Sequence, residues 1–168
     1  MITVTNGATI YGVDAKLITI EVNIVQGTNL YVVGLPDNAI KESQHRIESV
    51  LKFIKCEMPR QRVIVNLAPA DIRKEGAAYD LPIALSILNS SHQYHLPDLD
   101  KYMILGELAL DGSLRPIKGA LPIAMLVKQH GFKGFILPKE NAKEAADFIT
   151  DEISNDGFYK AVIDVLDR

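Results

Sequence analysis

A charged, glycine-bearing segment carries the residue types in this chain that could do chemistry. The sequence VNLAPADIRKEGAAYDLPIALSIL (Val65–Leu88) places Lys74, Glu75 and Asp80 around a glycine, between an apolar run and a small-residue run. A lysine there could act as a base only if burial lowered its pKa. The loop itself contains no Ser, Thr or Cys that such a base could activate. Two interpretations stay open, a binding site or a network of loop and helix-cap interactions made by Asp71, Lys74, Glu75 and Asp80.

A phosphate-binding loop is not indicated. In GATIYGVD, Gly7 and Gly12 have the spacing of the glycines in G-x-x-x-x-G-K-[ST]. Val13 and Asp14 stand where the lysine and the hydroxyl residue would contact phosphate and magnesium.

Metal and serine chemistry are also weakly indicated. His92 and His95 are close in sequence, but they lie in a polar connector without two further rigid ligands, so a solvated loop is favoured. Ser86 and Ser113 have no histidine beside them in sequence, so neither is assigned as a nucleophile.

The apolar patterns predict the elements that hold this loop. Residues 17–25 and 29–35 alternate as strands across a glycine-containing gap, which predicts an antiparallel hairpin. RVIVNL predicts a strand that leads into the loop, and DLPIALSILNSS predicts a buried helix with Asp80 as its cap and Pro82 in its first turn.

The stretch from Pro36 to Pro59 predicts one amphipathic helix, capped by Asp37 or Asn38 and ending just before Pro59. Its expected apolar face consists of Ile40, Ile47, Val50, Leu51 and Ile54.

The second half predicts a strand over 102–108 and a hairpin turn at Asp111-Gly112. It also predicts a helix over 120–130 closed by Gly131, a strand over 134–138, and helices over 139–149 and 157–168. The early strands and later βα units predict an α+β (mixed α/β) domain with a mixed sheet.

Length and composition favour one domain over residues 1–168 in a reducing compartment. The chain has 168 residues, 48% of them hydrophobic, which is enough for one core. Cys56 is its single cysteine, so a disulfide framework is excluded. No signal peptide and no apolar run near the roughly 20 residues of a spanning helix are visible. We therefore expect a cytoplasmic protein without a membrane partner.

Charge is distributed unevenly, although the net charge is only −3. The stretch from Lys41 to Lys74 holds eight Lys or Arg and four Asp or Glu, whereas the rest of the chain is acidic. Such a stretch could form a face for nucleic acid or an acidic partner, or simply a solvated helix face.

Three long motifs resemble one family. VGLPDNAIKES, VNLAPADIRKEGAAYDLPIAL and GELALDGSLRPIKGALPIA are similar, in this order, to the N-terminal domain of the Mg-chelatase-like AAA+ ATPases of the ComM/YifB type. The resemblance extends over roughly residues 2–146. It implies the ribosomal S5 domain 2-like fold, shared with the proteolytic domain of Lon and the C-terminal domain of RadA.

The resemblance to Lon also implies that the protease chemistry is lost. Lon has a Lys-Asp-Gly-Pro-Ser-Ala pattern with a nucleophilic serine, and KEGAAY places Ala78 at the serine position. The partner lysine of Lon corresponds to Leu121, and Lys118 lies three residues earlier. Without a hydroxyl, Lys118 would have nothing to activate.

The family implies a non-catalytic domain of a longer protein, without a cofactor or metal of its own. An AAA+ region that uses ATP and Mg is expected after residue 168, in a motor that forms a hexameric ring and drives DNA branch migration during recombination of incoming DNA. This domain would contact single-stranded or branched DNA, assemble the ring, or do both; the alternatives are a protein-interaction module and a residual hydrolase. Candidate DNA-binding or partner-binding residues are Lys41, Arg46, Arg60, Arg62, Arg73, Lys74, Glu75, Asp80 and Lys118.

Overall fold

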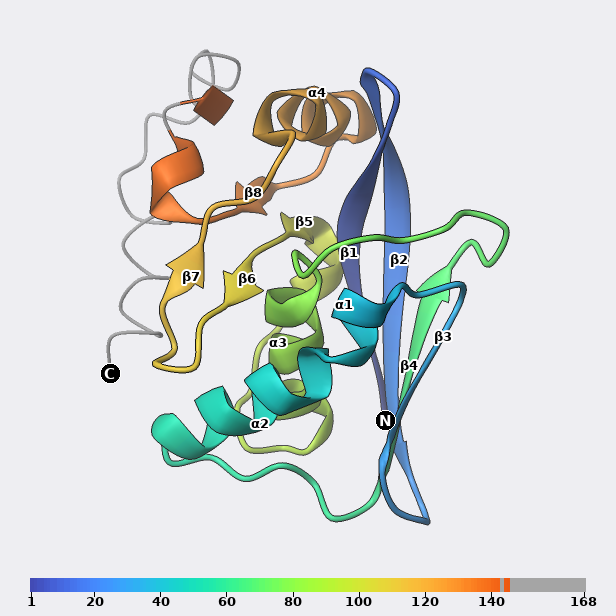
Figure 1. The fold of residues 1–168 in the computed structure, drawn as a ribbon, viewed down its shortest axis with the longest axis vertical. Coiled ribbons are helices and arrows are strands. Elements are labelled where there is room, and N and C mark those ends of the chain that lie inside the picture. The colour runs from blue at the N-terminus through green and yellow to red at the C-terminus, as the bar shows by residue number, and fades with distance from the viewer. Residues whose placement is uncertain (143, 146–168) are drawn as a thin grey trace.

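A mixed sheet forms the centre of the fold (Figure 1). The computed structural model describes residues 1–142, 144 and 145. Over this range the sheet has the strand order β3-β4-β2-β1-β5-β8, with both antiparallel and parallel pairs. The α+β prediction is therefore confirmed. The strands are β1 (Ile2–Tyr11), β2 (Asp14–Val25), β3 (Leu30–Val33), β4 (Arg62–Ala68), β5 (Tyr102–Ile104) and β8 (Gly134–Ile136).

The first hairpin is not the one that the sequence predicts. β2 pairs with β1, not with β3, across a two-residue turn that begins at Gly12, where φ is +66°. A glycine at this position suits the tight turn of a hairpin. β4 lies between β2 and β3, antiparallel to the first and parallel to the second. The prediction of a β2–β3 hairpin was wrong because a partner distant in sequence occupies the edge of β2, which a local turn signal does not reveal.

The predicted amphipathic helix is divided into α1 (Asn38–Lys41) and α2 (Ser43–Phe53). Asp37 caps α1, since its Oδ1 accepts a hydrogen bond from the Ile40 amide at 2.9 Å. Most of the predicted apolar face is confirmed, because its members in α1 and α2 are buried: Ile40, Ile47, Val50 and Leu51. Ile54, the last member, follows α2 and is half-buried. The apolar period continues across the break at Glu42, so the pattern alone does not show it.

The helix after the loop, α3 (Asp80–Ser90), is confirmed, with Pro82 in its first turn. Asp80 is not its cap, which corrects the prediction: Tyr79 occupies the N-cap position, without a side-chain cap bond. The Asp80 carboxylate instead accepts hydrogen bonds from Arg46 and from the Leu108 amide.

The second half largely follows the prediction. The hairpin at Asp111-Gly112 joins β6 (Glu107–Leu108) to β7 (Leu114–Arg115), and α4 (Ala120–His130) ends at Gly131 in the left-handed conformation. The strand expected over 102–108 is interrupted at Leu105 and Gly106, where the chain leaves the sheet. The 3-10 helix η1 (Leu99–Lys101) precedes β5, and the 3-10 helix η2 (Lys139–Asn141) follows β8. The helix expected over 157–168 lies outside the described residues, as do residues 143 and 146–149 of the helix expected over 139–149.

Helices pack on both faces of β1. Side chains of α3 contact alternate residues of β1 on one face. The Ser90 hydroxyl lies 2.7 Å from Thr3 Oγ1, and the Ser86 hydroxyl lies 3.2 Å from Thr5 Oγ1. Gly119, just before α4, contacts Ile10, which points to the opposite face because side chains alternate along a strand. No helix in the described part of the chain is long and apolar enough to cross a membrane.

Candidate functional site

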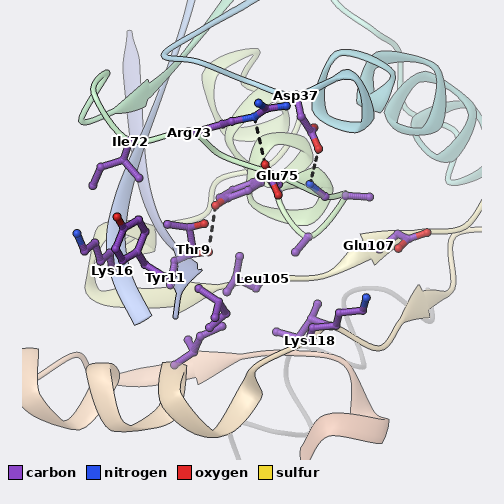
Figure 2. Close-up of a pocket in the computed structure, with 18 of the residues that line it drawn as sticks. Thr9, Tyr11, Lys16, Asp37, Ile72, Arg73, Glu75, Leu105, Glu107 and Lys118 are labelled. Carbon is purple, nitrogen blue, oxygen red and sulfur yellow. Dashed lines mark hydrogen bonds and ion pairs between the residues drawn. The ribbon is translucent and has the colours of Figure 1, made fainter. Parts of the chain in front are cut away.

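A cavity of about 1030 Å³ opens beside the end of β1 (Figure 2). The loop that leads into α3 forms one wall, and the segment between β7 and α4 forms another. Its lining includes Ala8–Gly12, Asp71–Arg73, Glu75–Tyr79, Leu105, Glu107 and Pro116–Lys118. The loop that the sequence indicates as a possible site therefore borders a real cavity.

Lys74 fixes this loop from the inside and does not line the cavity. Its side chain is fully buried, and its Nζ donates hydrogen bonds to the carbonyls of Gly34 (2.7 Å) and Pro69. Its backbone pairs with Leu35 and Asp37 on the neighbouring segment. Burial lowers the pKa of Lys74, and the charge of Asp71 partly offsets this effect. Both carbonyl contacts point to a structural role for the ammonium group.

Asp37 joins the loop to the start of α1. Its Oδ1 caps the helix, and its Oδ2 accepts a hydrogen bond from the Gly76 amide at 2.8 Å (Figure 2). Gly76 has a φ of +86°, a conformation that glycine adopts at little cost. Both carboxylate oxygens of Asp37 are thus occupied by backbone donors.

Asp80 and Arg46 form an ion pair beneath the loop. Arg46 Nε donates to Oδ2 at 2.6 Å and Nη2 donates to Oδ1 at 3.0 Å, a bidentate geometry. The Asp80 side chain is only 1% exposed and that of Arg46 is 20% exposed. Burial raises the pKa of Asp80, the pairing with Arg46 opposes that rise, and the same hydrogen bond raises the pKa of Arg46. The pair connects α2 to the start of α3.

Tyr79 closes the inner end of the cavity. Its hydroxyl donates a hydrogen bond to the Ala8 carbonyl at 3.1 Å, and the side chain is buried beside Gly7. Burial raises the pKa of Tyr79 from 10.0 to about 12. The sequence places Tyr79 in the candidate loop but does not predict its partner, because only the position of β1 in the sheet brings the Ala8 carbonyl to its hydroxyl.

Tyr79 should make folding sensitive to alkaline pH. Between pH 10 and about 12 the folded protein retains this proton while the unfolded chain loses it, so stability falls as the pH rises. We expect Tyr79→Phe to remove up to about 2–3 kcal/mol of this decline, while costing about 1 kcal/mol at neutral pH for the lost hydrogen bond. Urea unfolding at pH 8 and pH 11.5 measures both effects. An equal alkaline decline in wild type and variant would contradict the assignment.

Ala78 and Lys118 line the same cavity, whereas Leu121 lies in the first turn of α4, outside the described lining. None of the described lining residues is a serine or cysteine; the hydroxyls there belong to Thr9 and two tyrosines. Ser86 and Ser113 contact Thr5 and Asp111 instead of the cavity.

Arg73 and Glu75 pair with each other on the rim. The distance from Arg73 Nε to Glu75 Oε1 is 3.1 Å, and their side chains are 72% and 68% exposed. Such an exposed pair adds little stability and leaves both groups accessible to a partner.

The other basic candidates do not form one cluster. Arg46 and Lys74 are engaged inside the protein, while Lys41, Arg60, Arg62 and Arg73 are exposed. Arg62 begins β4, and its Cζ lies 5.5 Å from the centroid of the Tyr31 ring. Arg73 follows the other end of the strand. A seven-residue strand separates these ends by roughly 20 Å.

Metal binding gains no support from the described residues, in which no group of three or more His, Cys, Asp or Glu could hold an ion. Gly7 lies within β1 and Gly12 in the hairpin turn, so these two glycines do not form a loop before a helix.

The comparisons with known proteins give a consistent family. The family model for subunit ChlI of Mg-chelatase matches residues 20–141. The chain is 41% identical to the competence protein ComM of Haemophilus influenzae over 156 residues, which is 92% of this chain and 30% of that protein. It is 43% identical to the uncharacterised protein YifB of Escherichia coli over 134 residues, 79% of this chain and 26% of that protein.

A more distant similarity connects the chain to proteases. It is 26% identical over 152 residues to Lon protease 3 of Sorangium cellulosum, covering 84% of this chain and 18% of that protein. The chain thus spans about a third or less of the length of each of these relatives. From the match over residues 20–141 and the two stronger relatives, the chain belongs to the family of the Mg-chelatase subunit ChlI and is a member of the ComM/YifB type.

Proposed function

We propose that this chain is the non-catalytic N-terminal domain of a longer, cytoplasmic AAA+ ATPase that moves DNA branches during recombination of incoming DNA. In this proposal, the ATP and Mg sites belong to the ATPase region, and the domain contributes DNA contacts, assembly of a homo-oligomeric ring, or both. The name of the competence protein ComM supports the pathway.

The observation that supports a non-catalytic role most directly is the use of the charged loop residues. The Lys74 ammonium group is bonded to carbonyl oxygens, and the Asp80 carboxylate is bonded to Arg46. The described lining of the cavity includes Ala78 and contains no serine or cysteine. A hydrolase of the Lon type needs an activated nucleophile. Peptidase activity of the full-length protein that disappears in Lys118→Ala would contradict this part of the proposal.

DNA contact would use the basic residues that remain exposed. We expect the full-length protein to bind single-stranded and branched DNA with an affinity that falls steeply with salt. The quadruple alanine variant of Lys41, Arg60, Arg62 and Arg73 should lose at least tenfold in affinity at about 100 mM salt and show a shallower salt dependence. Fluorescence anisotropy measures both quantities.

A control removes two exposed lysines elsewhere. Lys128→Ala with Lys139→Ala keeps the four basic candidates and should leave DNA affinity unchanged. Equal affinity of the quadruple variant and wild type would exclude these four residues as the DNA contacts.

A second candidate, a protein-interaction module that docks on the ATPase ring, is favoured by the cavity. The basic residues at its rim are matched by acidic ones, which suits a polypeptide better than a polyanion. In that case the variants at Arg73 and Glu75 should disturb assembly in size-exclusion chromatography and leave DNA affinity intact.

A further inference from the structure

One edge of β1 is left without a strand partner inside the cavity. β1 continues to Tyr11, but β5 pairs with it at Asn6, opposite Met103. Beyond this point the chain after β5 turns away, with the Leu105 amide bonded to Ile136 and the Gly106 amide bonded to Ala78. Among the described residues, no strand covers this edge of β1 from Gly7 onward.

The hydrogen bond of Tyr79 shows which peptide groups face this edge. Because the Tyr79 hydroxyl donates to the Ala8 carbonyl, the backbone groups of Ala8 point away from β2. Consecutive residues of a strand direct their N–H and C=O groups to opposite edges. Asn6 and Ile10 therefore point the same way as Ala8, which agrees with the pairing of Asn6 with Met103. The N–H and C=O of Ile10 face the cavity.

The cavity has walls on both sides of this edge. Ala77, Ala78 and Leu105 lie on the side of the loop, and Ile117 and Ile123 lie on the side of α4. Figure 2 shows Leu105 between the loop and the segment that carries Lys118. A volume of about 1030 Å³ is at the upper end of the usual range for binding pockets, so it can accommodate an added strand of a few residues.

The charges favour a polypeptide as the occupant. The charged lining residues comprise four carboxylates and three cations, so the cavity does not attract a polyanion. The carboxylates are Asp37, Asp71, Glu75 and Glu107, and the cations are Lys16, Arg73 and Lys118.

We propose that the cavity binds an extended, uncharged peptide segment of a separate polypeptide, which adds as a strand to the free edge of β1 at Ala8–Tyr11. Backbone hydrogen bonds to Ile10 give affinity, and an apolar side chain of the segment packs against Ala78 and Leu105. The inference rests on the non-catalytic part of the proposed function, because a peptide held beside Ala78 must remain uncleaved.

The direct test is fluorescence anisotropy of a labelled pentapeptide, Ser-Val-Ser-Val-Ser, titrated with the 168-residue chain. We expect saturable binding that weakens at least tenfold in Ile10→Pro and is unchanged in Ile10→Val. Proline removes the N–H that faces the cavity, a substitution that an unpaired strand edge tolerates. Thermal unfolding establishes that the variant is folded, and Ala78→Leu, which narrows the same wall, provides a second variant with the same expected loss.

Two backbone-methylated peptides separate strand addition from adhesion of side chains. One carries N-methyl groups on its serines and the other on its valines, so only one of them loses the amides that face β1. We expect one methylated peptide to lose binding and the other to keep it. Hydrogen exchange of the Ile10 amide should slow at least tenfold with the unmodified peptide, while the Thr9 amide, which faces β2, stays unchanged.

Several results would overturn the inference. These are no saturable binding up to about 1 mM peptide, equal binding of both methylated peptides, or an Ile10 amide that exchanges at the same rate with and without peptide. Displacement of the peptide by an oligothymidine would assign the cavity to nucleic acid, and concentration-dependent dimerisation blocked by Ile10→Pro would assign the edge to a second copy of the chain. Binding followed by cleavage of the peptide would instead refute the non-catalytic function and leave the strand addition standing.

Discussion

Replacing Asp80 by alanine is expected to lower the free energy of unfolding by about 3–5 kcal/mol. The carboxylate is buried and bonded to two nitrogens of Arg46 and to the Leu108 amide. Its removal leaves the Arg46 guanidinium without its counter-charge at a site that is largely shielded from water. Breaking such a pair costs more than the pair itself contributes, because the remaining charge has lost its hydration.

Urea unfolding at neutral pH measures this loss, and Glu75→Ala is the matched control. Glu75 also pairs with an arginine of the same loop, but the side chains of both residues are exposed. We therefore expect the free energy of unfolding to change by at most about 1 kcal/mol. A double variant, Arg46→Met with Asp80→Leu, should recover much of the stability that the single substitution removes. Equal losses in Asp80→Ala and Glu75→Ala would show that burial does not determine the strength of the pair.

Replacing Gly34 by alanine should be equally damaging, for a steric reason. An added Cβ would lie 2.1 Å from the Leu67 carbonyl oxygen, and the residue has a φ of +97°, which side chains disfavour. Because the contact is with the backbone of β4, relief requires the segment after β3 to move away. That movement also displaces the Gly34 carbonyl from Lys74. We expect a loss of about 3–5 kcal/mol, measured by chemical unfolding.

Gly76→Ala separates the steric effect from the conformational one. Gly76 has a similarly positive φ of +86°, but an added Cβ would meet nothing within 4 Å. We expect this variant to lose about 1–2 kcal/mol, the cost of the left-handed backbone alone. If Gly34→Ala were no worse than Gly76→Ala, the close approach to Leu67 would not be the cause.

The sequence predicts the elements whose stability is local. The apolar period is sufficient for α3, the apolar period and the closing Gly131 are sufficient for α4, and Asp37 is found at the predicted cap of α1. The pairing of β2 with β1 and β4 was not predicted, because backbone hydrogen bonds do not distinguish one strand partner from another, and the strand order depends on the packing of the whole sheet.

The candidate site was predicted as a segment, but the roles of its residues were not. Asp80 begins a helix and has the chemistry of a cap, yet it bonds to Arg46, 34 residues away in sequence. Lys74 is charged and lies in a loop, so nothing in its neighbours reveals that it is fully buried. Tyr79 and the free edge of β1 become visible only when the strands are placed.

The two carbonyls held by Lys74 have a consequence for recognition. They connect the loop to the segment after β3 and to the end of β4, so one wall of the cavity is rigid before any partner arrives. Binding of an incoming segment then costs the translational, rotational and conformational entropy of that segment, with little added cost for ordering the wall. Substitutions that loosen Lys74 should therefore speed dissociation of a bound segment even when they change no residue that contacts it.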